Sequence, residues 1–341
     1  MRSEEQSSIV GGLPGFLGGV ALVIVFGTGL LLCSARWLWL GEMAFALRFP
    51  VGLLGLASAI ALYWGGGRIS VFFAVACASF HLAPELTMYM APTGTPTPAP
   101  ESPRIRVASC VVDPDLPEPE LLRAWLMVEA PDVVALQGLS PAWLSALEAV
   151  EADYPWRAVE PESASGFGED TLGVCLLSRY EIDTWRAQST VGKAPVLDAR
   201  LSIEGHPLHV VVTQLDNEGT PEGHDEHKLA FSALAQLVDW GRDSVLLGRL
   251  GSSEGSPLLT DFLAESGLRN ARRGFGRLPT WAPAGLPTFL GAGVDHVLVG
   301  RALAVESCRT GSGAGLGGQH LALSAALRLP PALEPLAAAG R

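Results

Sequence analysis

The segment Gly223-His224-Asp225-Glu226-His227 concentrates side chains that can bind a metal. His224 and His227 are three residues apart, so on a helix they share one face, and imidazole nitrogens are common zinc ligands. No third ligand follows at a useful spacing, although zinc sites need at least three protein ligands. The pair is therefore a candidate metal site, and a polar, solvated helix start is the commoner explanation of such a pattern.

Two further patterns do not match a known site. The five cysteines are scattered and show no CxxC spacing, so buried free thiols explain them better than zinc or disulfides do. The run GSGAGLGG at residues 311–318 lacks the strand, helix and acidic residue that accompany a dinucleotide-binding loop. It is expected to form a flexible loop.

Three apolar segments within residues 1–91 predict three transmembrane helices. Gln6 to Ala35 and Phe49 to Gly67 carry no charge, and Ile69 to Pro84 is interrupted only by His81. About 20 helical residues cross the hydrocarbon core. We therefore expect an integral membrane protein whose first partner is the lipid bilayer.

Basic residues near the spans do not decide the orientation. With three spans, the N-terminus and the soluble part lie on opposite sides of the membrane. Arg36 and Arg48 favour a cytoplasmic soluble part, whereas Arg2 and Arg68 favour the reverse.

A Pro/Thr-rich linker at residues 92–103 precedes an α/β domain at 104–330 and a tail at 331–341. The linker composition is typical of an extended, semi-rigid tether. Helices are expected after Pro117, after Ser140, from Gly223 through 229–240, and from Pro257 to Gly267. β-branched apolar runs predict strands at 105–112, 133–137, 172–177, 196–203, 208–215, 245–247, 294–299 and 321–327. The order lacks strict βα alternation, which favours a layered α/β sandwich.

The charge of the soluble part disfavours nucleic-acid partners. The chain has a net charge of −12, and the charges before residue 101 cancel, so the whole imbalance belongs to the soluble part. An acidic domain without a basic track repels phosphate backbones.

Nine short strings follow one another in the soluble part: IRVAS (105–109), PDVVALQ (131–137), SPAWL (140–144), LLSRY (176–180), VVVT (210–213), SGLRNARRGFG (266–276), PTW (279–281), VDHVLV (294–299) and GQH (318–320). In this order they resemble the endonuclease/exonuclease/phosphatase superfamily with the DNase I-like fold. The resemblance covers about residues 104–328 and is closest to bacterial members with three N-terminal membrane helices. It implies a four-layer α/β/β/α sandwich in a bacterial cytoplasmic membrane.

The resemblance also implies a metal-dependent phosphoesterase site. In that chemistry a divalent cation, usually magnesium, binds the phosphate, a carboxylate activates water, and a histidine held by a second carboxylate contacts the phosphate. Asp295 and His320 stand at the positions of that carboxylate and histidine. The remaining site positions have lost their polar residues: Val111 replaces an asparagine, Gly138 the metal-binding glutamate, Gln214 a histidine, Arg249 and Gly251 an aspartate and an asparagine, and Gln319 an aspartate.

These replacements predict a pseudoenzyme that uses no cofactor. Magnesium prefers carboxylate oxygens, and Arg249 places a positive charge where the cation would bind. Arg249 could instead bind a phosphate or pair with Asp295, and the Asp295–His320 pair could serve an anion contact or only a buried hydrogen bond. We expect a binding or scaffold role at the membrane, toward an unknown protein or a phosphate-containing ligand.

The alternative is a phosphodiesterase or phosphatase with an altered magnesium or manganese site. Asp216, Asn217 and Glu218 lie beside the expected site and could supply oxygens to a shifted metal. A structural partner of other membrane proteins is a third possibility.

Overall fold

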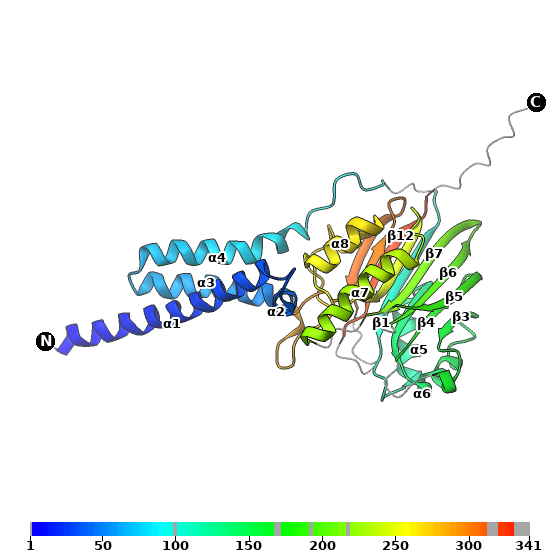
Figure 1. Cartoon of the computed structure of the whole chain (residues 1–341), viewed down its shortest axis with the longest axis horizontal. Coiled ribbons are helices and arrows are strands. Elements are labelled where there is room, and N and C mark those ends of the chain that lie inside the picture. Colours follow the sequence, from blue (N-terminus) through cyan, green and yellow to red (C-terminus); the bar gives the residue numbers. More distant parts are fainter. Residues whose placement is uncertain are drawn as a thin grey trace, which may run out of the picture.

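The computed structural model shows a bundle of long helices joined to an α/β domain (Figure 1). It describes residues 2–97, 101–166, 172–190, 194–215, 219–311 and 320–330, without the side chains of residues 2–11 and 164. Gln319 and residues 216–218 lie outside the described residues.

The bundle consists of α1 (Arg2–Cys33), α3 (Arg48–Trp64) and α4 (Arg68–Thr87). Three segments are long and apolar enough to cross a membrane, namely Gly12–Cys33, Trp39–Trp64, which includes the short helices before α3, and Arg68–Thr87. Glycines allow close packing in the bundle. A Cβ on Gly55, for example, would lie 2.9 Å from the Cβ of Ala78. The prediction of three helices of spanning length and composition is confirmed.

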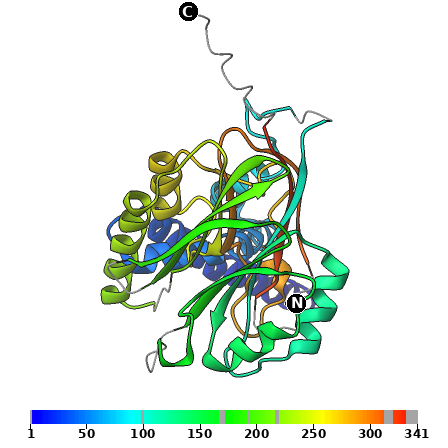
Figure 2. The same ribbon diagram turned by 90° about the vertical axis from the view of Figure 1, so that its right-hand side faces the viewer.

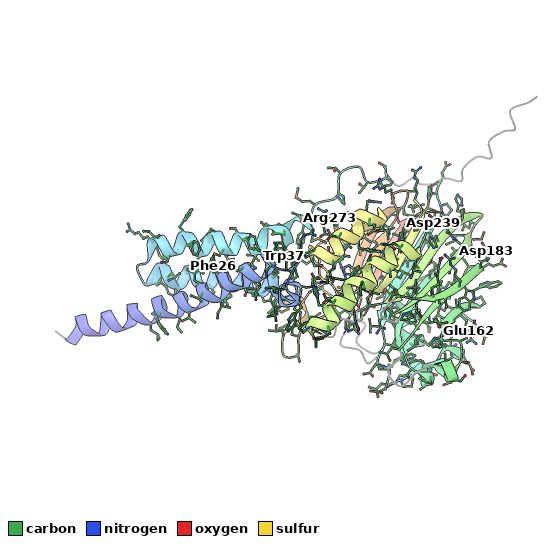
Figure 3. The ribbon with its side chains drawn as sticks, in the orientation of Figure 1. Phe26, Trp37, Glu162, Asp183, Asp239 and Arg273 are labelled. Carbon is green, nitrogen blue, oxygen red and sulfur yellow. The ribbon has the colours of Figure 1, made fainter. Side chains whose placement is uncertain are left out.

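A folded connector links α1 to α3. Residues 34–47, here called the connector, contain α2 (Trp39–Ala44) and the 3₁₀ helix η1 (Phe45–Leu47), neither of which the sequence predicted. The connector lies at the end of the bundle that faces the domain (Figure 1). Trp37 is 76% exposed there (Figure 3), a position typical of residues at a membrane interface.

Twelve strands in the described residues form two sheets of six, in the orders β11-β12-β1-β2-β4-β3 and β5-β6-β7-β8-β10-β9. Central strands read as continuous apolar runs because both of their faces are buried. Val133, for example, contacts the core between the sheets, and Val134 contacts the core under the outer helices. The strands are β1 (Arg104–Val111), β2 (Val133–Leu139), β3 (Trp156–Glu160), β4 (Gly173–Ser178), β5 (Ile182–Ser189), β6 (Pro195–Ile203), β7 (His206–Gln214), β8 (Ser244–Arg249), β9 (Arg269–Asn270), β10 (Asp295–Val299), β11 (Ala304–Thr310) and β12 (Leu323–Arg328).

Two helices cover the outer face of each sheet (Figure 2). α5 (Pro119–Glu129) and α6 (Pro141–Glu148) pack on the first sheet, and α7 (Pro221–Leu237) and α8 (Pro257–Ser266) pack on the second. The short 3₁₀ helices η2 (Ala164–Gly166) and η3 (Thr288–Leu290) lie in loops. The predicted four-layer α/β/β/α sandwich is confirmed.

Several predicted helix boundaries were wrong. The proline that opens α5 is Pro119 and not Pro117, and α7 ends at Leu237, three residues before the predicted end. Ser140 precedes α6, but its hydroxyl donates to the carbonyl of Pro114 at 2.6 Å and does not cap the helix. Ser256, by contrast, caps α8 by accepting a hydrogen bond from Leu259 N.

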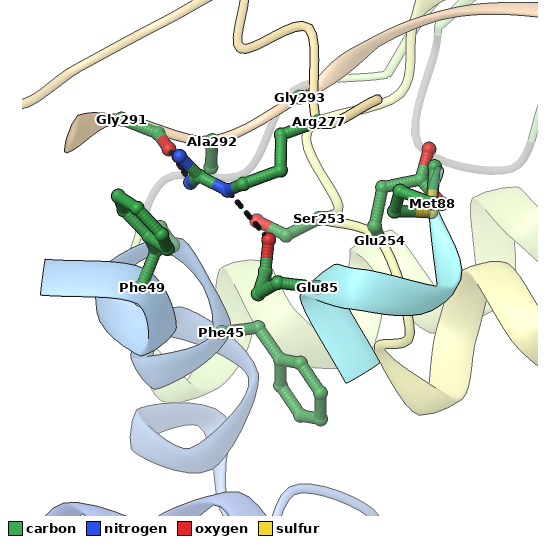
Figure 4. Close-up of a pocket in the computed structure, with 11 residues that line it drawn as sticks. Phe45, Phe49, Glu85, Met88, Ser253, Glu254, Arg277, Gly291, Ala292 and Gly293 are labelled. Carbon is green, nitrogen blue, oxygen red and sulfur yellow. Dashed lines mark hydrogen bonds and ion pairs between the residues drawn. The ribbon is translucent and has the colours of Figure 1, made fainter. Parts of the chain in front are cut away.

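The domain docks directly on the bundle instead of hanging from a free tether. Arg277 donates from Nε to Glu85 of α4 at 2.6 Å, and its guanidinium lies 3.5 Å from the ring centroid of Phe49 in α3 (Figure 4). The carbonyl of Met88, just after α4, accepts hydrogen bonds from Gly274 N and Gly276 N. These contacts fix which edge of the sandwich faces the membrane helices.

Candidate functional site

The predicted site positions converge at one edge of the sandwich. Gln214, Arg249 and Asp295 are register partners across β7, β8 and β10. On the other sheet, Val111 ends β1 opposite Gln137 of β2. The strands therefore bring together residues that are far apart in the sequence.

Asp295 and His320 are in direct contact. The Nδ1 atom of His320 and Oδ2 of Asp295 are 2.7 Å apart, and both side chains are buried. Burial by itself raises the pKa of Asp295, but the charge and hydrogen bond of His320 and the charge of Arg249 hold it below its usual value. The other carboxylate oxygen, Oδ1, has no hydrogen-bond partner among the described residues.

Arg249 brings an uncompensated positive charge into this cleft. It ends β8 directly opposite Asp295, and its side chain is half-buried. Across the described part of the chain, the guanidinium makes no hydrogen bond and no ion pair within 4 Å, so its influence on Asp295 is purely coulombic. A guanidinium with this geometry repels a metal cation and attracts an anion.

Gly138 stands where the family resemblance implies a metal-binding glutamate, and it offers the cleft no side chain. Gly138 sits at an irregularity of the β2–β4 pairing and has a φ of +85°. A Cβ there would lie only 2.7 Å from the carbonyl oxygen of Val112. The backbone at this position is therefore unsuited to a glutamate.

The described residues do not fit a divalent metal. No three His, Cys, Asp or Glu side chains gather among them in a group that could hold an ion. Near the site, Asp295 is already bonded to His320 and lies opposite a guanidinium.

The histidines of α7 have separate environments. His227 is buried, donates from Nε2 to the carbonyl of Leu250 at 2.7 Å, and packs against the ring of Phe231. His224 is also buried, and neither of its ring nitrogens has a hydrogen-bond partner among the described residues. The hydrogen bond of His227 supports the loop after β8, which is a structural role.

All five cysteines are free. The three in the domain, Cys110, Cys175 and Cys308, are buried, as expected for structural thiols, whereas Cys33 of the bundle is exposed.

A buried polar network supports Asp295 from behind, and the sequence did not reveal it. Arg272 is fully buried and donates to the carbonyl of Asp295 and to Nδ1 of His296. Nε2 of His296 donates to the carbonyl of Ser252 at 2.9 Å, and Asn270 bridges His296 and Glu254. Two members of this network lie in the string SGLRNARRGFG, which in the sequence indicated only the fold.

The cleft opens into a cavity that the connector closes on the other side. The cavity has a volume of about 530 Å³ and borders Arg249 and His320. Glu42, the only charged residue between Trp37 and Leu47, lines it from α2 and accepts a hydrogen bond from Ser252 at 2.7 Å. The sequence signal for this contact was a single acid inside an otherwise uncharged run.

Comparisons with known proteins agree with this architecture. The protein-family model described as "Endonuclease/Exonuclease/phosphatase family" matches residues 112–316. No curated protein matches the sequence.

Several solved structures resemble the domain. An endonuclease/exonuclease/phosphatase from Beutenbergia cavernae DSM 12333 has a TM-score of 0.54 at 19% identity, covering 67% of this chain and 72% of its own. A protein described in the same words from Bacteroides vulgatus has a TM-score of 0.53 at 14% identity, covering 67% and 99%. The human Nocturnin catalytic domain with bound sulfate has a TM-score of 0.51 at 15% identity, covering 67% and 94%. At these identities the likeness concerns the fold alone.

Proposed function

Because this chain belongs to the endonuclease/exonuclease/phosphatase family but lacks most of the site that the resemblance implies, we propose that it is a non-catalytic member anchored in a membrane. Its role is to bind a phosphate-containing ligand or a protein through the former catalytic cleft. The membrane is a bacterial cytoplasmic membrane, and nucleic acid is not a partner of this acidic domain.

The proposal rests on three register partners at the edge of the second sheet: Gln214, Arg249 and Asp295. A phosphoesterase of this type needs a cation opposite the water that attacks. Here the central one of the three is a guanidinium, and Gln214 is neutral and a poor base. The loss of one such group typically lowers the rate about a hundredfold or more, and several are replaced here.

A turnover assay tests the proposal. Full-length protein in detergent is incubated with magnesium, manganese or zinc and with a generic phosphodiester and several phosphomonoesters. We expect no turnover above that of His320→Ala and no metal binding by calorimetry. Turnover that His320→Ala abolishes would overturn the proposal.

One observation favours the alternative, a phosphodiesterase or phosphatase with an altered magnesium or manganese site. The hydrogen bond between Asp295 and His320 is intact at 2.7 Å, although the surrounding polar positions are replaced. Under this alternative, turnover is lost in His320→Ala and lowered in Asp295→Asn, which no longer holds the histidine by its charge, and the same assay reports both.

A further inference from the structure

We propose that the cavity between the connector and the cleft binds the headgroup of a membrane phospholipid that combines a phosphate with a hydrogen-bond donor. This inference rests on the proposed non-catalytic cleft and names its ligand. The geometry points to a lipid because the cavity combines charged and polar groups, from the domain and from Glu42, with apolar side chains of α1 and the connector.

The apolar walls reach into the membrane-spanning segment. Thr28 and Leu31 of α1 line the cavity together with Leu40, Met43 and Leu47 of the connector. Thr28 lies within the span that ends at Cys33, so the cavity extends roughly 8 Å back along that helix. A ligand in this cavity can keep its acyl chains beside the bundle while its headgroup reaches the domain.

The polar end suits a phosphate. Arg249 borders the cavity with no hydrogen-bond or ion-pair partner among the described residues. His320 also borders it, and because Nδ1 is engaged by Asp295, Nε2 is the ring nitrogen left for a ligand. Because Nδ1–H is given to the Asp295 carboxylate, only the imidazolium form of His320 offers an Nε2–H as well. A guanidinium and that imidazolium N–H together are donors that a phosphate accepts without a metal.

Glu42 accounts for the hydrogen-bond donor on the ligand. Its side chain is only 3% exposed and lines the same cavity. Oε1 accepts from Ser252, whereas Oε2 has no partner in the described part of the chain. A buried carboxylate oxygen without a partner is costly, so a hydroxyl or ammonium group of a lipid headgroup would stabilise it.

Charge on the rest of the molecule is consistent with docking at a lipid surface. Glu162, Asp183 and Asp239 lie on the domain away from the bundle, whereas Arg273 lies near the junction (Figure 3). These three acidic side chains therefore lie away from the end of the domain that meets the membrane helices.

The experiment measures lipid binding by full-length protein in detergent, using phosphatidylglycerol and phosphatidylcholine as probes. We expect phosphatidylglycerol to raise the thermal midpoint and to co-purify, and phosphatidylcholine, whose headgroup has no donor, to do neither. Arg249→Gln should weaken phosphatidylglycerol binding about tenfold to a hundredfold, because a charged hydrogen bond is lost. Arg36→Gln, which removes an exposed cation outside the cavity, is the matched control and should bind as the wild type does.

A second variant separates lost binding from misfolding. Leu47→Trp fills the apolar wall and leaves Arg249 in place, so it should also weaken lipid binding. Equal binding by the wild type and both variants would overturn the inference, as would binding of inorganic phosphate or glycerol phosphate as tight as that of the lipid.

The chemical state of the lipid distinguishes the two proposals. Bound lipid that is recovered intact after incubation with magnesium supports both proposals. Hydrolysed lipid would overturn the non-catalytic function and leave recognition of the lipid standing. Intact lipid that never bound would overturn the lipid inference and leave the non-catalytic function standing.

Discussion

Gly138 and Gly251 have both replaced polar residues that the family resemblance implies, but their backbones differ in what they tolerate. Gly251 has a φ of +67°, a region in which asparagine is often found. Gly138 has a φ of +85°, and any Cβ would collide with the carbonyl of Val112. The backbone at Gly138 therefore disfavours the glutamate that the family resemblance implies at this position.

Gly138→Ala tests whether the backbone at this position tolerates a side chain. We expect it to lower the free energy of unfolding by about 1–3 kcal/mol, because the substitution combines a left-handed φ with a steric contact. The measurement is a denaturant titration of the full-length protein in detergent.

Gly205→Ala is its matched control. Gly205 also has a positive φ, +81°, but a Cβ there has no heavy atom within 4 Å. Gly205→Ala should therefore lower the free energy of unfolding by less than Gly138→Ala does. An equal decrease for the two would show that the contact with Val112 is unimportant.

At the scale of elements, the buried network fixes β10 relative to its neighbours. Arg272 follows β9, His296 lies within β10, and Ser252 follows β8, so their hydrogen bonds join three segments behind the site. Burial, and secondarily the charge of Arg272, lower the pKa of His296 to about 3. The imidazole is therefore neutral in the folded protein, with Nε2 as the donor.

This network predicts a pH dependence of stability. An unfolded histidine has a pKa of about 6.5, so between pH 6.5 and about 3 the unfolded state binds a proton that folded His296 does not. Stability is therefore lost as the pH falls through this window, by up to about 1.4 kcal/mol per pH unit from this residue.

His296→Gln should make that slope shallower. Unfolding is measured by denaturant between pH 7 and pH 4 for both proteins. The same slope in both would mean that His296 is protonated in the folded state, contrary to the role of its Nδ1 as the acceptor from Arg272.

At the scale of the whole molecule, the domain and the membrane helices form one assembly around the cleft. The connector lines one side of the cavity beside the cleft, and Arg277 joins the domain to α3 and α4. Of the two basic residues that favour a cytoplasmic domain, Arg36 contacts the domain, whereas Arg48 packs within the bundle. Arg36 pairs with Asp261, and Arg48 is buried against Phe80.

Arg277→Met should loosen the junction. The ion pair with Glu85 is largely shielded, so losing it leaves a carboxylate without its partner and should cost about 3–5 kcal/mol. We expect a lower thermal midpoint and faster proteolysis near residue 92. Arg36→Met is the control, because its ion pair with Asp261 is exposed and should contribute little. Equal effects of the two variants would contradict the assigned role of Arg277.

The sequence by itself determined the three apolar helices, the sandwich and its eight central strands. Central strands are buried on both faces, so they appear as apolar runs. The four strands that the sequence missed, β3, β5, β9 and β11, all lie at sheet edges. β5, for example, is mostly exposed and reads IDTWRAQS, because an edge strand needs no continuous apolar run.

The sequence, through its family resemblance, also named the positions of the site, but only the tertiary structure decided their surroundings. It brought Arg249 opposite Asp295, gave Gly138 a backbone closed to side chains, and laid the connector across the cleft. These features depend on contacts between segments up to about 200 residues apart, such as Glu42 with Ser252. Local residue patterns carry no information about such contacts, because periodicity reports which face of an element is buried and not what buries it.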